Sequence, residues 1–232
     1  MNARIDTFVA PPCAEDIAIL YQDDVILLIN KPSGLLSLSG KNPLNLDSVH
    51  YRLVQQFPTA LLLHRLDFGT SGIMIVALNK AVAANINRQF QARTVVKTYQ
   101  AVLAGHVVAD EGDIDLPIAK DPATFPKLKV CFETGKAASS HFQVLDRQTA
   151  PDTTRVLFTP STGRTHQLRI HSAGIGHPIL GCDLYGTADS QHVANRLLLH
   201  AIGVEFDHPV SGDRFSGVSD CPFWLGGQPS II

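Results

Sequence analysis

The sequence has few cysteines, and no two of them lie at a short, regular spacing. The four are scattered over 232 residues, with no Cys-x-x-Cys motif among Cys13, Cys131, Cys182 and Cys221. This pattern argues against a zinc ribbon or a dithiol redox motif. Scattered thiols suit a reducing compartment, so we expect a cytoplasmic protein.

Long apolar runs are also missing. No stretch approaches the roughly 20 apolar residues that a membrane helix needs. The N-terminus lacks the pattern of a signal peptide, so we expect no membrane partner. The hydrophobic fraction of 45% and the charged fraction of 17% are typical of a soluble globular protein with a sizeable core.

The sequence lacks the strong positive charge of many nucleic-acid-binding proteins, because its formal net charge is −2. The distribution is more informative than the total. Residues 31–105 contain eight Lys and Arg against two Asp, whereas acidic residues gather at 110–115. A nearly neutral protein can still present one basic face, and this segment predicts one. The alternative is that these cations are scattered, solvated residues.

Hydrophobic patterning predicts more strands than helices. Amphipathic helices are expected over 47–57, capped by Asp47 or Ser48, and over 80–93. The acidic segment 110–115 is expected to be an exposed loop. The expected strands are 25–30, 61–63, 73–78, 98–104, 129–133, 140–146, 153–159 and 197–204.

The order of these elements favours an α+β fold, because the strands do not alternate strictly with helices. We expect a mixed, mostly antiparallel sheet with flanking helices, in one domain spanning residues 1–232. Within it, residues 1–18 are expected to form a loosely ordered arm, residues 205–215 a hairpin, and the last residues a Pro/Gly-rich tail.

The nine residues 64–72 join two apolar runs that read as buried strands. The connector therefore holds Asp67 and Arg65 close to a core, where a charge needs a partner or a task. Gly69 and Gly72 permit a tight turn that faces a ligand. The plainer alternative is that Asp67 caps a turn and Arg65 is solvated, because Asp and Gly are common turn residues.

Histidines offer a first alternative site, a metal centre. Zinc sites usually take two ligands at close spacing on one element, such as i and i+4. His166 and His171 are five residues apart, and no thiolates or carboxylates are grouped with them. The spacing therefore argues against a metal bound by His64, His166, His171, His177 and His200.

Two further alternatives concern carboxylates. A glycosidase-like pair would need a second acid beside Asp67, and the segment 110–115 is the candidate source. The other alternative is a lone carboxylate attended by the cations of 163–169, which include Arg164 and Arg169. Burial raises the pKa of a carboxyl group and a nearby guanidinium lowers it, so a buried acid that must be ionised needs such a neighbour.

A series of motifs resembles the RluA family of pseudouridine synthases. They occur in the family's order, cover nearly the whole chain, and are far more specific than a lone glycine pattern. The matching residues are Asn30-Lys31-Pro32-Ser33-Gly34-Leu35, His64-Arg65-Leu66-Asp67 with Thr70-Ser71-Gly72, Lys97-Thr98-Tyr99, Gly163-Arg164-Thr165-His166-Gln167-Leu168-Arg169-Ile170-His171, Gly176-His177-Pro178-Ile179-Leu180-Gly181 and Leu198-Leu199-His200-Ala201.

The resemblance implies an isomerase that detaches a uracil from its ribose at N1, turns it and rejoins it at C5. It implies Asp67 as the catalytic aspartate, Tyr99 against the target base and Arg169 as the partner of the aspartate. Arg65 would fill the gap left by a flipped base. The same motifs contain the remaining residues expected to hold substrate, which are His64, Thr70, Lys97, Arg164 and His166.

The resemblance further implies no cofactor and no metal, and leaves open whether the aspartate adds covalently or abstracts a proton. It implies the family's catalytic fold with a central RNA-binding cleft. The implied partners are a tRNA anticodon loop, a large-subunit rRNA helix or both, through a specific uridine in each, and a different target position in these RNAs is the alternative. Many relatives carry an N-terminal S4 domain, and we expect none here, because the first motif already begins at Asn30. We expect a monomer. A rival interpretation is an RNA-binding relative that has lost catalysis.

Overall fold

A ten-stranded sheet forms the frame of the structure, a computed structural model that describes residues 8–223. The strand order is β1-β2-β4-β11-β5-β10-β9-β6, with β3 beside β4 and β12 beside β11. The strands are β1 (Ala18–Gln22), β2 (Ile26–Lys31), β3 (Leu61–Leu62), β4 (Ser71–Ala77), β5 (Val96–Ala104), β6 (Glu111–Asp115), β9 (Ser139–Thr149), β10 (Asp152–Pro160), β11 (Leu199–Asp207) and β12 (Arg214–Val218).

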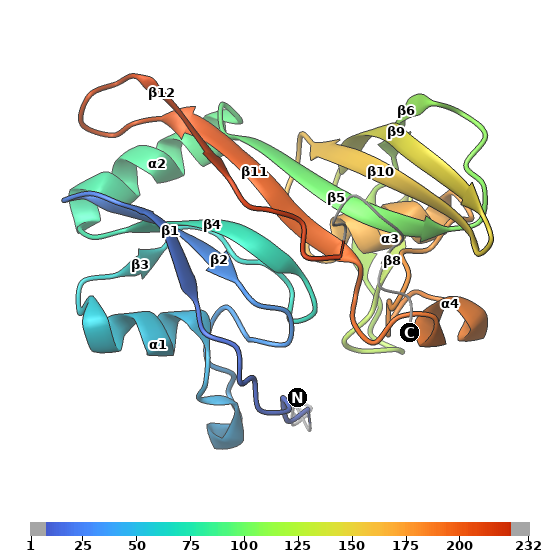
Figure 1. Ribbon diagram of the computed structural model, residues 1–232, viewed down its shortest axis with the longest axis horizontal. Helices are drawn as coiled ribbons and strands as arrows, with labels where there is room; N and C mark the ends of the chain where they lie inside the picture. The colour runs from blue at the N-terminus through green and yellow to red at the C-terminus, as the bar shows by residue number, and fades with distance from the viewer. Residues whose placement is uncertain (1–7, 224–232) are drawn as a thin grey trace.

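Nearly all neighbouring strands of this sheet run antiparallel, and the pair β4 and β11 is parallel. The predicted mixed, mostly antiparallel α+β fold is therefore confirmed. Figure 1 shows β11 and β5 running diagonally across the molecule, so that they join the half containing β1–β4 to the half containing β6, β9 and β10.

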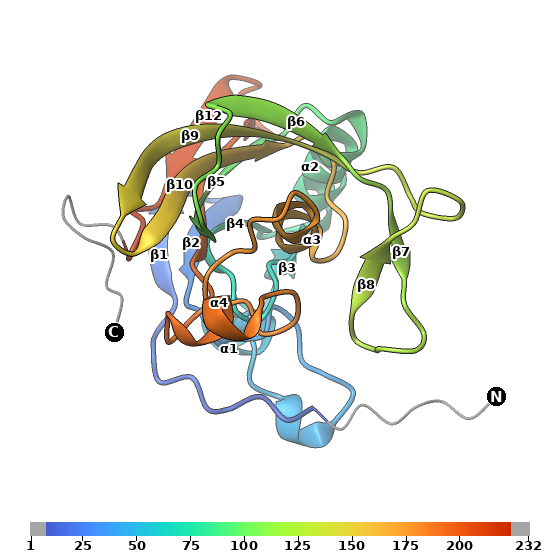
Figure 2. The ribbon, with the colours of Figure 1, turned by 90° about the vertical axis from the view of Figure 1, so that its right-hand side faces the viewer.

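The helices are short and lie beside the sheet. They are α1 (Val49–Gln56), α2 (Lys80–Ala92), α3 (Gln167–Gly174) and α4 (Ala188–His192). Ser48 caps α1 and Asn79 caps α2 through their side-chain oxygens. In Figure 2, α3 lies inside the curve formed by β9, β10 and β6, and a small two-stranded sheet of β7 (Ile118–Lys120) and β8 (Leu128–Val130) stands beside it.

Two hydrophobic cores lie on the two halves of the sheet. The first joins β2 and β4 to α1 and α2, and the second joins β5 and β10 to α3. Every residue of β4 is buried, in keeping with the continuous apolar run from Ile73 to Ala77. Tyr99 on β5 packs against both cores, so it marks the boundary between the two halves.

The secondary structure predicted for two segments was wrong. The acidic segment is the edge strand β6, in which Ile114 is buried while the alternate positions Glu111, Asp113 and Asp115 are exposed. Charges on an outer face are usual for an edge strand, because they discourage pairing with other chains. The predicted strand 129–133 ends at Val130, because the chain turns and the amide of Gly135 bonds to the carbonyl of Cys131.

The ends of the chain carry little further structure. Residues 8–17 contain no helix or strand, and β1, β7 and α4 were not predicted. The Pro/Gly-rich tail and the first residues of the predicted arm lie outside the described residues. Within residues 8–223 the longest helix, α2, has 13 residues, and no helix is long and apolar enough to cross a membrane.

Candidate active site

Lys31 at the end of β2 fixes the loop that carries Asp67. Its ammonium is fully buried and donates hydrogen bonds to the carbonyl oxygens of Pro32 (2.8 Å), Leu35 (2.7 Å) and Phe68 (3.2 Å). Burial lowers the pKa of Lys31 to about 7, although the nearby charge of Asp67 acts to raise it. The last of these carbonyls belongs to the residue after Asp67, so Lys31 holds the loop at the carboxylate.

Serines complete this attachment. The hydroxyl of Ser33 donates to the carbonyl of Gly69 (2.7 Å), and that of Ser37 donates to the carbonyl of Leu66 (2.7 Å). The Ser37 oxygen also accepts from the Leu66 amide (3.1 Å). Residues 31–37 thus bind the backbone of the loop at Leu66, Phe68 and Gly69, on both sides of Asp67.

The C-terminal end of the loop leads into β4, where Gly72 belongs to a row of paired residues on four neighbouring strands. In register, Lys31 pairs with Gly72, Gly72 with Ala201, and Ala201 with Tyr99. Gly72 has φ +118°, and a Cβ there would lie 2.3 Å from the carbonyl oxygen of Ala201. A glycine is therefore required for β11 to approach this closely, and the approach fixes the Asp67 loop relative to Tyr99.

Arg169 comes from the buried face of α3. Its side chain is 5% exposed, and Nη1 lies 3.8 Å from Oδ2 of Asp67, whose side chain is 18% exposed. On the other side, its Nη2 donates to Asp183 and its Nε donates to Sγ of Cys182 (3.4 Å). The guanidinium also lies over the ring of Tyr185, 5.4 Å from its centroid. One buried cation therefore serves two carboxylates.

His166 and Tyr185 flank this ion pair. His166 precedes α3 with φ 57°, in the left-handed region, and its Nδ1 lies 2.8 Å from the hydroxyl of Tyr185. That hydroxyl accepts from the amide of Leu128 (2.9 Å), so it is free to donate its own proton to the imidazole. Burial lowers the pKa of His166, which favours the neutral ring.

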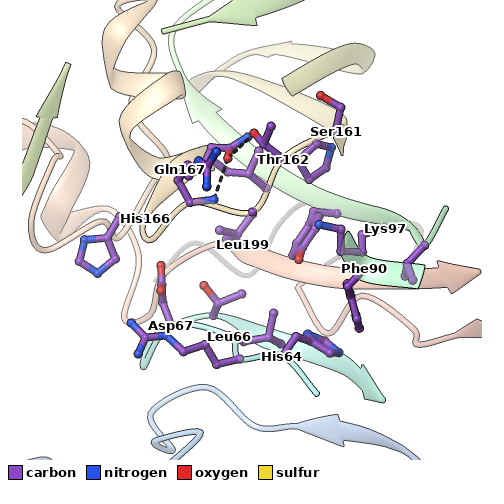
Figure 3. Close-up of a pocket in the computed structure, with 18 of the residues that line it drawn as sticks. His64, Leu66, Asp67, Phe90, Lys97, Ser161, Thr162, His166, Gln167 and Leu199 are labelled. Atoms are coloured by element: carbon purple, nitrogen blue, oxygen red, sulfur yellow. Dashed lines mark hydrogen bonds between the residues drawn. The ribbon is translucent and has the colours of Figure 1, made fainter. Parts of the chain in front are cut away.

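These side chains surround a cavity of about 510 Å³, which we call the first cavity. Figure 3 shows Asp67 within it, with His166 and Gln167 on one side and His64, Phe90 and Lys97 on the other. Its lining carries five Lys and Arg against one acid, Asp67. The cations are Arg65, Arg93, Lys97, Arg164 and Arg169. The excess of positive charge suits a ligand that carries several negative charges.

All nine predicted site residues lie along this cavity. Tyr99 is partly buried, and burial together with the charge of Asp67 raises the pKa of its phenol. Arg65 is exposed and Thr70 is buried. Burial lowers the pKa of Lys97. The remaining members of the predicted set are His64, Asp67, Arg164, His166 and Arg169.

His64 differs from the others, because its ring is engaged by the fold. Its Nε2 accepts a hydrogen bond from the amide of Ile75 (3.0 Å), and the ring packs on Phe90 with centroids 5.3 Å apart. Burial, with a further contribution from Lys97, lowers the pKa of His64 to about 3. The imidazole is a neutral acceptor that shapes the wall of the cavity.

Histidines elsewhere are also committed to separate partners. The ring of His171 bonds to the carbonyl of Leu116, and that of His177 to the carbonyl of Ala104. His200 lies fully buried between Ser71 and Ser219. Within residues 8–223, no three His, Cys, Asp or Glu side chains are close enough together to hold a metal ion.

A second cavity, of about 1210 Å³, lies on the other side of the ion pair. Five residues line both cavities: Arg65, Leu66, Asp67, His166 and Arg169. Its remaining walls include Phe8, Leu38, Phe68 and Phe125. The carboxylate therefore lies where a cationic chamber meets a more apolar one.

Sequence reasoning missed several residues of this site. Lys31 belongs to one of the matching motifs, but the pattern indicated only the end of a strand there, although a lysine after five apolar residues was a usable signal. Asp183 and Tyr185 follow the last residue of another motif and gave no signal of their own. Arg93, which ends α2 in the left-handed region, reaches the cavity only through the fold.

Comparisons with known proteins agree with this geometry. Residues 25–174 match the family model described as RNA pseudouridylate synthase. The chain is 49% identical over 194 residues to the dual-specificity RNA pseudouridine synthase RluA of Yersinia pestis, covering 84% of this chain and 94% of that protein. It is 45% identical over 206 residues to the Escherichia coli K12 protein of the same name, covering 89% and 94%.

Solved structures are similar as well. The human protein RNA Pseudouridylate Synthase Domain Containing 1 has a TM-score of 0.77 and 30% identity, over 92% of this chain and 87% of that one. Human RNA Pseudouridylate Synthase Domain Containing 4 has a TM-score of 0.70 and 26% identity, over 88% of each chain.

Proposed function

Because the chain belongs to the RNA pseudouridylate synthase family, we propose that Asp67, Tyr99 and Arg169 carry out its isomerisation of uridine within structured RNA. The protein is an enzyme, an isomerase whose substrate is RNA. The observation that carries the assignment is the buried guanidinium of Arg169, 3.8 Å from Asp67, in a cationic cavity.

The reaction is an isomerisation, so the nucleotide keeps its composition. The bond between N1 and C1′ breaks, the uracil turns, and C5 bonds to C1′. The proton on C5 is then released and N1 gains one. No electrons are transferred to or from an outside group, so the steps call for a carboxylate, a hydrogen-bonding environment and room for a base to turn.

Asp67 must be ionised whether it attacks the nucleotide or removes a ribose proton. The guanidinium of Arg169, with Nη1 3.8 Å from Oδ2, places a positive charge beside that carboxylate. Arg169 is in turn held by Asp183, Cys182 and Tyr185, so it has little freedom to close on the carboxylate. A carboxylate that is paired at a distance keeps its oxygens available to the substrate.

Tyr99 offers an aromatic face beside Asp67. Its phenol stays protonated at neutral pH, because burial and the Asp67 charge raise its pKa. Stacking on an aromatic ring is worth about 1–3 kcal/mol and tolerates rotation of the base. Tyr99 therefore suits a uracil that has to turn during the reaction.

A uridine in a stem or stacked loop reaches such a cavity only when it is flipped out, at a cost of about a few kcal/mol. Arg65 is exposed and lines both cavities, so it is suited to fill the vacated space. Arg164 and Lys97 would bind phosphates, with Arg93 beside them. Thr70, His64 and His166 would shape and position the walls.

The substrates proposed are tRNA and large-subunit rRNA, the two RNAs implied by the motifs, and the two bacterial relatives are likewise named dual-specificity enzymes. One catalytic domain acting as a monomer would suffice for the reaction, because both cavities are formed by a single chain. The proposed compartment is the cytoplasm.

The test is tritium release from RNA labelled at C5 of uridine, with bulk tRNA and bulk rRNA assayed separately. We expect release from both, and none with Asp67→Asn. An enzyme that releases tritium from neither RNA would overturn the proposal and favour an RNA-binding relative without catalysis.

A further inference from the structure

The second cavity exposes apolar side chains that the proposed reaction does not use. Phe125 is 61% exposed, Leu38 is 50% exposed and Phe8 is 46% exposed, and all three line this cavity. The ring of Phe68 lies edge-on to that of Phe8, with centroids 5.5 Å apart. Exposed aromatic residues gathered around one concave surface are typical of a binding site.

The electrostatics of the two cavities differ. The first carries five Lys and Arg against one acid, and this suits phosphates. The second is balanced, because Arg65, Arg169 and Arg196 face Glu15, Asp67 and Asp183. A neutral, apolar chamber is unsuited to a phosphate backbone and well suited to the flat face of an uncharged base.

The position of the second cavity, next to the first, indicates which kind of ligand would bind there. Asp67, Arg65 and three other residues line both chambers, so any ligand in the second lies next to the target nucleotide. Extruding a uridine from a loop leaves its neighbours without a stacking partner. An RNA whose target uridine occupies the first cavity would therefore bring unpaired bases close to the second.

We propose that the second cavity is a stacking subsite for an unpaired base that neighbours the target uridine, with Phe125 as its main platform. The inference rests on the proposed function, since it assumes an RNA in the first cavity. At about 1210 Å³ the second cavity has more than twice the volume of the first, and so has room for such a base.

The experiment compares Phe125→Ala with a matched control, Phe132→Ala. Phe132 is 76% exposed, follows β8, and lines neither cavity. Using a synthetic tRNA anticodon stem-loop labelled at C5 of uridine, we expect Phe125→Ala to raise KM and Kd about tenfold, consistent with losing one stacked base. We expect kcat to change less than about twofold and Phe132→Ala to resemble the wild type.

Two further arms identify stacking as the cause. Phe125→Trp should restore the affinity, whereas Phe125→Leu should not, because a leucine buries area without a flat aromatic face. Replacing loop nucleotides one at a time by abasic ones should weaken wild-type binding at a non-target position. Phe125→Ala should then lose nothing more at that position, because the two changes remove the same contact.

The outcomes separate this proposal from the proposed function. If the wild type releases tritium and Phe125→Ala has the wild-type KM and Kd, the subsite is wrong and the enzymatic assignment stands. If the wild type releases no tritium, the assignment fails, and the Kd values of the variants still judge the subsite. Losses that add at every abasic position would also overturn the subsite.

Discussion

Arg169 places its Nη1 atom 3.8 Å from Oδ2 of Asp67, although the same guanidinium binds Asp183 directly. The separation is longer than a hydrogen bond. The inner carboxylate is 18% exposed and the outer one is 74% exposed. The shorter interaction is therefore the one that water screens, and the longer one is in the drier place.

This arrangement makes Arg169 matter more than Asp183. We predict that Arg169→Ala abolishes turnover and lowers the free energy of unfolding by about 1–3 kcal/mol, because Asp67 and Cys182 lose a buried partner. Asp183→Asn should change stability by less than about 1 kcal/mol, since its side chain is mostly solvated. Urea unfolding and tritium release measure both. Full activity and an unchanged melting temperature in Arg169→Ala would refute the pairing.

A second prediction isolates the charge of Asp67. Asp67→Asn keeps the shape of the side chain and removes the ionisable group, so turnover should disappear. RNA affinity should stay close to that of the wild type, because the five cations of the first cavity are unchanged. Single-turnover kinetics and fluorescence anisotropy test the two halves of the prediction. Measurable turnover by this variant would remove Asp67 from its assigned role.

A third prediction concerns acid. Burial lowers the pKa of His64 to about 3 and that of His200 to about 4. An unfolded histidine titrates near 6.5, so between about pH 6.5 and 4 the unfolded chain binds protons that the folded chain does not. Stability therefore falls as pH falls through this window, by up to about 1.4 kcal/mol per pH unit for each histidine.

The measurement is urea unfolding at pH 7 and pH 5. His200→Gln should show a smaller loss of stability between the two values than the wild type does. The matched control is His106→Gln, because His106 is exposed. Equal losses in all three proteins would show that His200 is not kept neutral by the fold.

A fourth prediction follows from the cations of the first cavity. Phosphate contacts release counterions, so log Kd for RNA should rise linearly with log salt concentration, and Arg93→Ala should reduce that slope by about 1. Lys80→Ala is the control, since Lys80 is exposed and lines neither cavity. A flat salt response in the wild type would contradict a basic RNA-binding face.

The sequence predicted the strands that are buried on both sides, because short, continuous apolar runs are typical of such strands. It failed at β6, because three of the five residues are acidic and Ile114 is the one buried apolar side chain on the inner face of that strand. The motifs contain all nine predicted site residues, which the fold brings to one cavity. What the motifs omit, such as the role of Lys31 or the contact of Asp183 with Arg169, depends on loops that pack together only in the folded chain.

The last prediction concerns the close contact between β4 and β11. Gly176 has φ +86° and open space where a Cβ would lie, whereas Gly72 combines φ +118° with backbone atoms of Ala201 at 2.3–2.8 Å from that position. Gly176→Ala should therefore cost about 1–2 kcal/mol, from backbone strain alone. Gly72→Ala should cost more than about 3 kcal/mol, because the strands must also separate.

Separation at Gly72 should affect catalysis as well as folding. The row Lys31, Gly72, Ala201 and Tyr99 sets the distance between the Asp67 loop and the aromatic ring. Folded Gly72→Ala, assayed well below its melting temperature, should have a reduced kcat, while folded Gly176→Ala should keep the wild-type value. Equal kcat values in the two variants would mean that the register of this row does not align Asp67 with Tyr99, the two residues proposed to act on the uridine.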